Sequence, residues 1–136
     1  MSFLIDTCVL SEETRPRPNL SVDAWLKREL ANGAFVSAIS LVEIEYGILS
    51  MPAGRKRTML ERWFHGQIVP QTRPGLVAVD EDIALRCGAL MSQNPNTEVP
   101  DALIAATALV HGLVVATRNV KHFRFDGLTV VNPWEA

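Results

Sequence analysis

Short runs of β-forming residues alternate along this chain with longer segments of helical periodicity, and this alternation limits the fold more than any other feature. It is typical of an α/β domain with a mainly parallel sheet, because a crossover between parallel strands is usually a helix. The strand candidates are SFLI (2–5), AFVSAI (34–39), GLVAVD (75–80), LVVAT (113–117) and LTVV (128–131). We therefore predict an α/β domain built on a parallel sheet.

Apolar residues recur at helical spacing between these strands. The segment SVDAWLKREL (21–30) predicts an amphipathic helix, with Ser21 as its N-cap and Asn32-Gly33 as its end. Further helices are expected over residues 40–49, around residues 59–64, after Asp80 and from about residue 100 to His111.

Composition indicates one soluble domain. A length of 136 residues with 48% hydrophobic content is compatible with a single core over residues 1–136. The net charge of −2 argues against a protein that holds nucleic acid by bulk electrostatics, so a polyanion would need a local basic patch. The chain has neither a long uncharged apolar run nor the pattern of a secretion signal, so we expect a cytoplasmic protein without membrane contact.

Four oxygen-bearing side chains stand at strand-to-helix transitions or in first helical turns. Asp6 follows the first strand, Glu43 lies one turn into the helix after the second, Asp101 heads the last long helix, and Asn119 comes shortly after LVVAT. In open α/β sheets the ligand crevice lies at the carboxyl ends of the strands. We therefore expect these four residues to face one crevice.

Each of these residues also has an ordinary structural interpretation. Asp6 fits the cap of a short helix, and Ser40 with Glu43 has the spacing of a capping box. Asp101 behind a proline suits the positive end of a helix, and Asn119 suits a turn. The functional hypothesis depends on all four occurring at the same edge of the sheet.

Hard-cation binding is the chemistry that such an arrangement needs. Crowded carboxylates repel one another unless a cation neutralises them, and Mg²⁺ binds to few protein ligands while substrate phosphate completes its shell. A metal held in this way promotes phosphodiester hydrolysis without a covalent intermediate. Cys8 is a weaker candidate nucleophile because it has no evident histidine partner, and Cys8 and Cys87 are expected to be small core residues rather than disulfide or zinc ligands.

Several motifs together resemble a known family. FLIDT, SLVEIEYG, PDALIAATAL, ATRNVKHF and the final VNPW occur in the order found in PIN-domain ribonucleases, and closely resemble the VapC-type toxins of bacterial toxin-antitoxin modules. The resemblance covers essentially the whole chain. It implies a PIN-like α/β domain with helices on both sides of a parallel sheet, a Mg²⁺ or Mn²⁺ site, endonucleolytic cleavage of RNA, a homodimer and inhibition by a cognate antitoxin.

The resemblance also assigns roles by position. The catalytic group falls on Asp6, Glu43, Asp101 and Asn119, with Asp6 and Asp101 as direct metal ligands and Glu43 as a ligand or a base acting through bound water. Asn119 would be a neutral ligand or a hydrogen-bond donor behind the ligands. Thr117 would fix a metal-bound water or a carboxylate.

Two positions depart from the family pattern. Many relatives carry an acid at the position of Asn119, and many carry Asp where this chain has His122, so three carboxylates remain. A catalytically inactive PIN-like module that binds RNA or protein is therefore the alternative. His122 fits either a surface histidine or a phosphate contact, and the basic residues Arg118, Lys121 and Arg124 are predicted to hold the RNA backbone.

Overall fold

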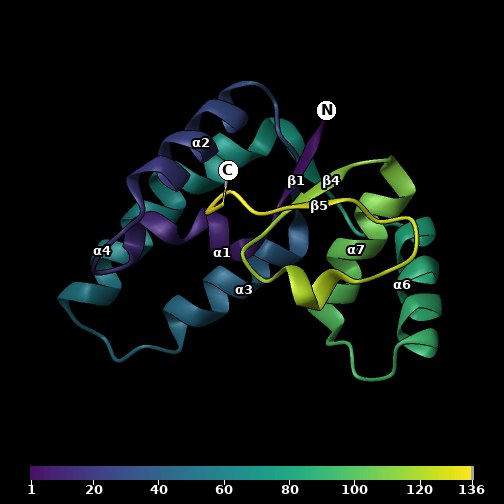
Figure 1. The fold of residues 1–136 in the computed structure, drawn as a ribbon. Coiled ribbons are helices and arrows are strands. Elements are labelled where there is room, and N and C mark those ends of the chain that lie inside the picture. Colours follow the sequence, from purple (N-terminus) through teal and green to yellow (C-terminus); the bar gives the residue numbers. More distant parts are fainter. Residues whose placement is uncertain (136) are drawn as a thin grey trace.

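The computed structural model describes residues 1–135 and contains parallel strands only (Figure 1). One sheet pairs β1 (Phe3–Ile5), β4 (Val114–Ala116) and β5 (Val130–Val131), and a second pairs β2 (Val36–Ser37) with β3 (Leu76–Val77). A parallel bridge between Leu4 and Phe35 joins the two, which gives the order β3-β2-β1-β4-β5. Because β1 lies in the middle, the residue that follows it emerges at the centre of the carboxyl edge.

Helices cover both faces of this sheet, as predicted. They are α1 (Thr7–Leu10), α2 (Leu20–Ala31), α3 (Ala38–Leu49), α4 (Arg55–Trp63), α5 (Val69–Thr72), α6 (Glu81–Gln93) and α7 (Val99–His111). Short turns are η1 (Glu12–Thr14), the π-helical η2 (Phe64–Ile68), η3 (Arg73–Gly75) and η4 (Val120–Phe123). In Figure 1, α6 and α7 lie on one side of the strands, and α1 to α4 gather on the other. None of the helices within residues 1–135 has the length and hydropathy needed to cross a bilayer.

Two hydrophobic cores follow from the alternation of side chains along the central strands. Leu4 and Val115 are fully buried in the core under α6 and α7, whereas their neighbours Ile5 and Ala116 are fully buried in the core on the opposite face. Successive strand residues point to opposite faces, so apolar residues at consecutive positions require a cover on both. This is why these strands are continuous apolar runs.

The helix α2 begins earlier than the sequence predicts. Asn19, not Ser21, is the N-cap, since the Asn19 side chain accepts a hydrogen bond of 3.1 Å from the backbone N–H of Val22. The backbone N–H of Asn19 in turn donates to Glu12 Oε2 at 2.7 Å, which fixes the cap in place. The prediction of Ser21 was therefore wrong, because a better-anchored capping residue lies two positions upstream.

The second strand is shorter, and its helix longer, than predicted. The helix α3 already begins after Ser37, whose hydroxyl accepts from the N–H of Ile39 at 3.2 Å. Ser40 is therefore buried inside α3 rather than at its start, and the capping box that Ser40 and Glu43 could have formed is absent. The strand candidates at residues 75–80 and 128–131 are likewise reduced to two residues each, β3 and β5.

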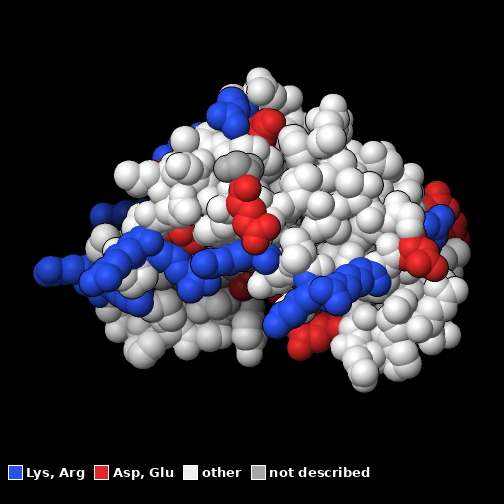
Figure 2. Space-filling model, viewed as in Figure 1, with Lys and Arg blue, Asp and Glu red and all other residues white. Residues whose placement is uncertain are grey.

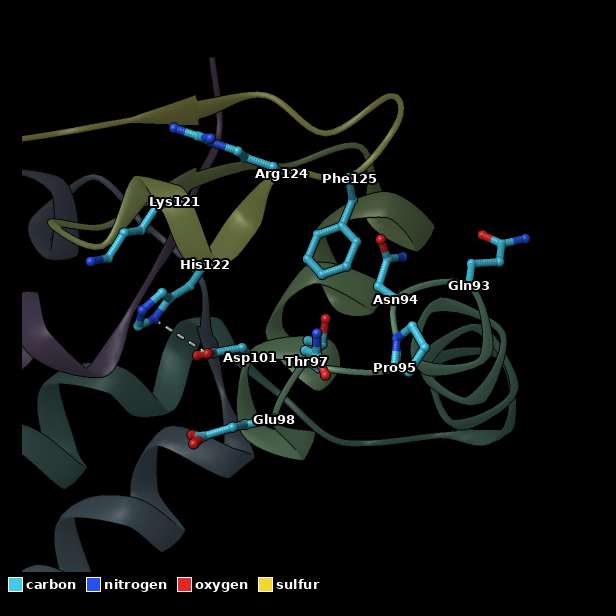
Figure 3. Close-up of a pocket in the computed structure, with 11 residues that line it drawn as sticks. Gln93, Asn94, Pro95, Thr97, Glu98, Asp101, Lys121, His122, Arg124 and Phe125 are labelled. Carbon is cyan, nitrogen blue, oxygen red and sulfur yellow. Dashed lines mark ion pairs between the residues drawn. The ribbon is translucent and has the colours of Figure 1, made fainter.

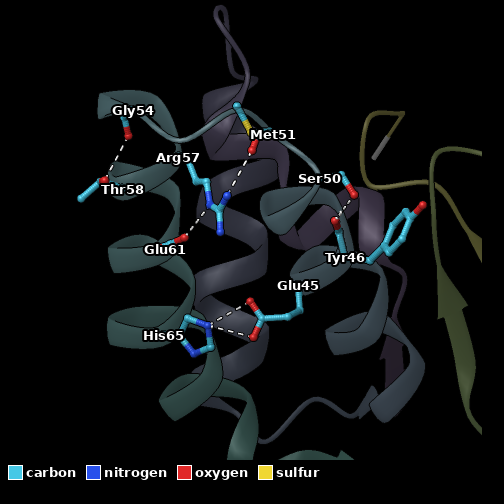
Figure 4. A network of polar contacts seen from close by, with 9 residues as sticks. All are labelled: Glu45, Tyr46, Ser50, Met51, Gly54, Arg57, Thr58, Glu61 and His65. Carbon is cyan, nitrogen blue, oxygen red and sulfur yellow. Dashed lines mark hydrogen bonds and ion pairs between the residues drawn. The ribbon is translucent and has the colours of Figure 1, made fainter.

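Polar contacts link side chains of α3, α4 and η2 on the side of the sheet that carries the core around Ile5 and Ala116. His65 in η2 lies 3.0 Å from Glu45 of α3, and Arg57 donates to Glu61 one turn along α4 at 2.9 Å (Figure 4). The contact between His65 and Glu45 joins η2 to α3, whereas Arg57 and Glu61 pair within α4. Glu45 therefore makes a structural contact between two elements.

Candidate active site

Asp6 lies at the centre of the carboxyl edge, immediately after β1, and is 6% exposed. Its Oδ1 accepts from the backbone N–H of Thr7 at 2.8 Å, and its Oδ2 accepts from the Thr117 hydroxyl at 2.7 Å. The two interpretations of Asp6 are therefore compatible, because one carboxylate caps α1 and also faces the site. Thr117, just beyond β4, fixes this carboxylate.

Thr7 connects Glu43 to the same edge. The hydroxyl of Thr7 donates to Glu43 Oε1 at 2.7 Å and lies 2.9 Å from the hydroxyl of the buried Ser40. The sequence analysis missed both hydroxyl groups, although Thr7 follows Asp6 directly in the FLIDT motif. The hydrogen bond from Thr7, the first residue of α1, thus links Glu43 to the edge where Asp6 lies.

The charges of the other acids affect the pKa of Asp101. Burial, and after it the negative charges of Asp6, Glu43 and Glu98, raise the pKa of Asp101 to about 6 against the opposing effect of His122. Asp101 Oδ2 lies 3.5 Å from Nδ1 of His122, an ion pair drawn in Figure 3. Asp101 is therefore close enough to the other carboxylates to be repelled by them.

The pKa of Glu43 is also raised, so its charged form is less stable than that of an ordinary glutamate. Burial raises the pKa of its carboxyl group, the hydrogen bond from Thr7 lowers it, and the charges of Asp6 and Glu98 raise it. Glu98 is the N-cap residue of α7, its side chain makes no capping hydrogen bond, and it lies one turn ahead of Asp101. The sequence analysis did not single out Glu98, although its three-residue spacing from Asp101 places both on one side of the helix start.

The donor set suits a hard cation that keeps part of its water shell. Among residues 1–135, no three His, Cys, Asp or Glu side chains are already close enough to hold one metal ion together. Mg²⁺ does not require such closure, since it is usually bound by one or two carboxylates, several waters and substrate phosphate. Mutual repulsion of the acids provides the electrostatic reason for a cation to bind.

Cys8 lies beside the site, which corrects the expectation that it is only a core residue. Its sulfur is 3.6 Å from Asp6 Oδ2 and 3.6 Å from the Thr117 hydroxyl oxygen. Burial and then the charge of Asp6 raise the pKa of the Cys8 thiol to about 11. The thiol is therefore protonated at neutral pH and is a poor nucleophile. Cys87, in contrast, is buried in the core as predicted.

Asn119 is placed near the site without a contact to the acids. Its backbone N–H donates to the Thr117 hydroxyl at 3.0 Å and its carbonyl accepts from the N–H of His122 at 2.9 Å. Its side-chain amide forms none of the hydrogen bonds found within residues 1–135, and the residue is exposed. Arg118 is exposed as well, and its guanidinium lies 5.1 Å from the centre of the Trp134 ring.

A cavity of about 560 Å³ extends from Asp101 and His122 towards the loop between α6 and α7. Lys121 and Arg124 line the same cavity, so cationic side chains adjoin the acids (Figure 3). Figure 2 shows Lys and Arg side chains in a band across the viewed face, over α4 and over η4. The site thus combines an acidic centre with a basic rim, which is the charge pattern needed for a metal and a polyanion.

Comparisons with known proteins agree with this fold. The model of the PIN domain family matches residues 3–128. The chain is 34% identical to the VapC ribonuclease Y4jK of Sinorhizobium fredii, with 98% of each chain covered. The crystal structure of FitAcB from Neisseria gonorrhoeae has a TM-score of 0.86 and 33% identity over 98% of this chain and 99% of that chain. A toxin-antitoxin complex from Klebsiella pneumoniae has a TM-score of 0.70 and 26% identity over 97% and 98% of the two chains.

A parallel α/β domain with carboxylates gathered at the central strand defines a nuclease-like class of fold and site. The family model matches most of this chain, and the relatives align with it over nearly their whole length, so the family can be assigned. The chain belongs to the PIN-domain family, in the branch of the VapC-type toxins.

Proposed function

We propose that this chain is an endoribonuclease toxin that hydrolyses RNA phosphodiester bonds with Mg²⁺ or Mn²⁺ and is neutralised by a cognate antitoxin. The observation that carries the proposal is the position of the buried Asp6 at the centre of the carboxyl edge, held by Thr7 and Thr117, with Glu43 joined to the same edge through Thr7. Beyond the effect of burial, the charge of Asp6 raises the pKa of both Glu43 and Asp101. The printed names of the relatives, a ribonuclease and a toxin in a toxin-antitoxin complex, support it.

Asp6 and Asp101 are the proposed metal ligands, with Glu43 as a third ligand or as a base acting through bound water. A bound divalent ion would polarise the scissile phosphate and lower the pKa of a water molecule. The Thr7 N–H donates to Asp6 Oδ1, and the Thr117 hydroxyl and the Cys8 thiol donate to Oδ2, so Oδ1 retains a lone pair that no other donor found within residues 1–135 uses.

Glu43 accepts from the Thr7 hydroxyl at one oxygen, which orients the other oxygen as a proton acceptor. Its raised pKa makes it a stronger base than an ordinary glutamate, which suits a group that takes up a proton. Lys121 and Arg124 are proposed to hold RNA phosphates beside Asp101. Arg118 would contribute charge from its position over Trp134, and Asn119 a neutral donor or ligand.

The proposed partners are an antitoxin and a second copy of the chain, acting in the cytoplasm as a single PIN domain over residues 1–136. Three large apolar side chains of α3 support a protein contact, because Val42, Tyr46 and Leu49 are 57%, 74% and 52% exposed. Neighbouring exposed apolar residues are typical of interaction sites. The proposal assigns this face of α3 to the homodimer.

The test is cleavage of a defined single-stranded RNA by the purified protein. We expect cleavage with Mg²⁺ or Mn²⁺, none in EDTA, and a loss of at least about 100-fold in Asp6→Asn, since the metal supplies both charge stabilisation and the nucleophile. Asp82→Asn is the matched control, because Asp82 lines a surface beside Leu109 and Val110 at the other end of α7. Equal activity of Asp6→Asn and Asp82→Asn would contradict the proposed site.

The alternative is an inactive PIN-like module that binds RNA or protein, and it is favoured by the neutral Asn119. It predicts RNA or antitoxin binding without metal-dependent cleavage. A protein that binds RNA but leaves it intact in both metals would establish this alternative.

A further inference from the structure

The cavity that begins at Asp101 extends well beyond the acidic centre. At its near end it is lined by Asp101 and His122, and at its far end by Phe125 and by the loop of residues 94–97. Its far end contains no acid, so a metal ion has no reason to occupy it. This part of the cavity is left unexplained by phosphodiester hydrolysis alone.

The cavity is large enough for one nucleotide, and it opens onto the acidic centre at Asp101. A volume of about 560 Å³ lies within the range of small-molecule pockets, roughly 300–1,000 Å³. A base-paired helix cannot enter such a space, whereas a single unpaired base can. Specific recognition of RNA uses unpaired bases of this kind.

Phe125 provides an apolar surface inside the cavity. Figure 3 shows its ring projecting into the space between Asp101 and Asn94. The residue is half-buried and packs against the core under α6 and α7, which holds the ring in position. Stacking of bases on aromatic rings is worth about 1–3 kcal/mol for each base.

Two asparagine side chains, those of Asn94 and Asn96, line the same cavity as Phe125. The Nδ2 of Asn94 donates to the carbonyl of Leu90 at 3.0 Å, which fixes the side chain and leaves its Oδ1 as an acceptor. Asn96 lines the cavity, is exposed, and uses its amide in none of the hydrogen bonds within residues 1–135. An amide that offers both a donor and an acceptor matches the hydrogen-bonding edge of a nucleobase.

We propose that the cavity between η4 and the α6–α7 loop is a nucleobase subsite, in which Phe125 stacks on the base next to the scissile phosphate and Asn96 contacts its edge. This inference rests on the proposed ribonuclease function, and it makes the subsite a determinant of where RNA is cut. Lys121 and Arg124 bind the backbone at the rim, and the enzyme selects unpaired segments of RNA.

The first experiment measures binding of single-stranded hexaribonucleotides of mixed sequence in EDTA, where cleavage is blocked. Phe125→Leu keeps an apolar side chain against the core and removes the stacking surface. We expect it to bind about 5- to 150-fold more weakly, the fold-change that corresponds to the loss of one stacked base. Leu85→Ala, at a 69% exposed residue on α6 outside this cavity, should bind as the unmodified protein does. Equal affinity of Phe125→Leu and the unmodified protein overturns the subsite, and so does an absence of binding by the unmodified protein.

The second experiment maps cleavage positions in a pool of random RNA with Mn²⁺. Asn96 is exposed, and Asn96→Asp replaces its NH2 group, which carries two N–H donors, by a charged acceptor, so we expect the preferred base at one position beside the cut to change. An unchanged map contradicts the subsite and leaves the ribonuclease function standing. If no RNA is cleaved by any form but hexanucleotide binding still depends on Phe125, the ribonuclease proposal fails and with it the role of the cavity in cleavage, and only a site that binds a nucleobase remains.

Discussion

Individual side chains at this site serve the fold and the chemistry at once. Asp6 caps α1 and receives the Thr117 hydroxyl, so its carboxylate is held by two donors from segments that are far apart in sequence. Donors that hold a ligating carboxylate commonly matter almost as much as the ligand itself. Thr117 is fully buried, so its side chain does not contact solvent.

Removal of the Thr117 hydroxyl should therefore weaken metal binding. For Thr117→Val, which keeps the shape, we expect a loss of about 10- to 100-fold in metal affinity or activity. Isothermal titration with Mn²⁺ measures the affinity. Thr129→Val, at an exposed threonine outside the site, is the control, and equal affinities of the two variants would show that Thr117 does not orient Asp6.

The raised pKa of Asp101 predicts a pH-dependent cost to stability. In metal-free protein the folded state holds its proton up to a pH of about 6, compared with 3.8 for the ordinary group, so the free energy of unfolding falls as pH rises through this window and stays lower above it. Asp101→Asn removes the cost. We expect it to be more stable than the unmodified protein by about 1 kcal/mol at pH 7, after allowance for solvent screening, with the advantage vanishing towards pH 4.

Urea denaturation in EDTA at a series of pH values measures this difference. Millimolar Mg²⁺ should stabilise the unmodified protein more than Asp101→Asn, because a ligand that binds only the folded state raises its stability. A constant difference between the two proteins from pH 4 to pH 7 would contradict the assignment.

At the scale of helices and strands, the ends of elements were harder to predict than their existence. Apolar periodicity predicted α2, α3, α6 and α7 and the parallel strands, because burial against a sheet leaves a strong pattern. The boundaries depended on hydrogen bonds between distant residues, such as the one from the Asn19 N–H to Glu12, which no local pattern contains. Ser21 lies in a favourable local sequence and still is not the cap.

The two candidate caps of α2 can be compared directly. Asn19→Ala removes the acceptor for the Val22 N–H and should lower the free energy of unfolding by about 1 kcal/mol. Ser21→Ala, inside the exposed first turn, should have little effect or a slightly favourable one, since alanine has the higher helix propensity. Thermal unfolding of both variants decides between the caps, and a larger loss in Ser21→Ala would restore the sequence-based assignment.

The candidate site was predictable in part for the same reason. Asp6 could be predicted at the carboxyl edge because it directly follows a strand, and Glu43 and Asp101 because helices that connect parallel strands begin at that edge. Thr7 and Glu98 were missed and Cys8 was assigned to the core, because their contribution comes from side-chain geometry across α1, α3 and α7 rather than from a motif. The position of Phe125 in a cavity depends in the same way on how η4 packs over the α6–α7 loop.

At the scale of the whole molecule, the apolar face of α3 predicts self-association. Tyr46→Glu places a charge in the middle of this face, and we expect it to convert a dimer to a monomer at micromolar concentration. Light scattering after size-exclusion chromatography measures the mass. Leu85→Glu, on α6, is the control, and a mass unaffected by Tyr46→Glu would assign the dimer contact elsewhere.

The donors around Asp6 come from opposite ends of the chain, since Thr7 lies near the start and Thr117 near the finish. During synthesis, a ribosome must therefore translate past Thr117 before the pocket can form. A nascent chain that stopped short of this residue would lack the hydroxyl that holds Asp6 Oδ2.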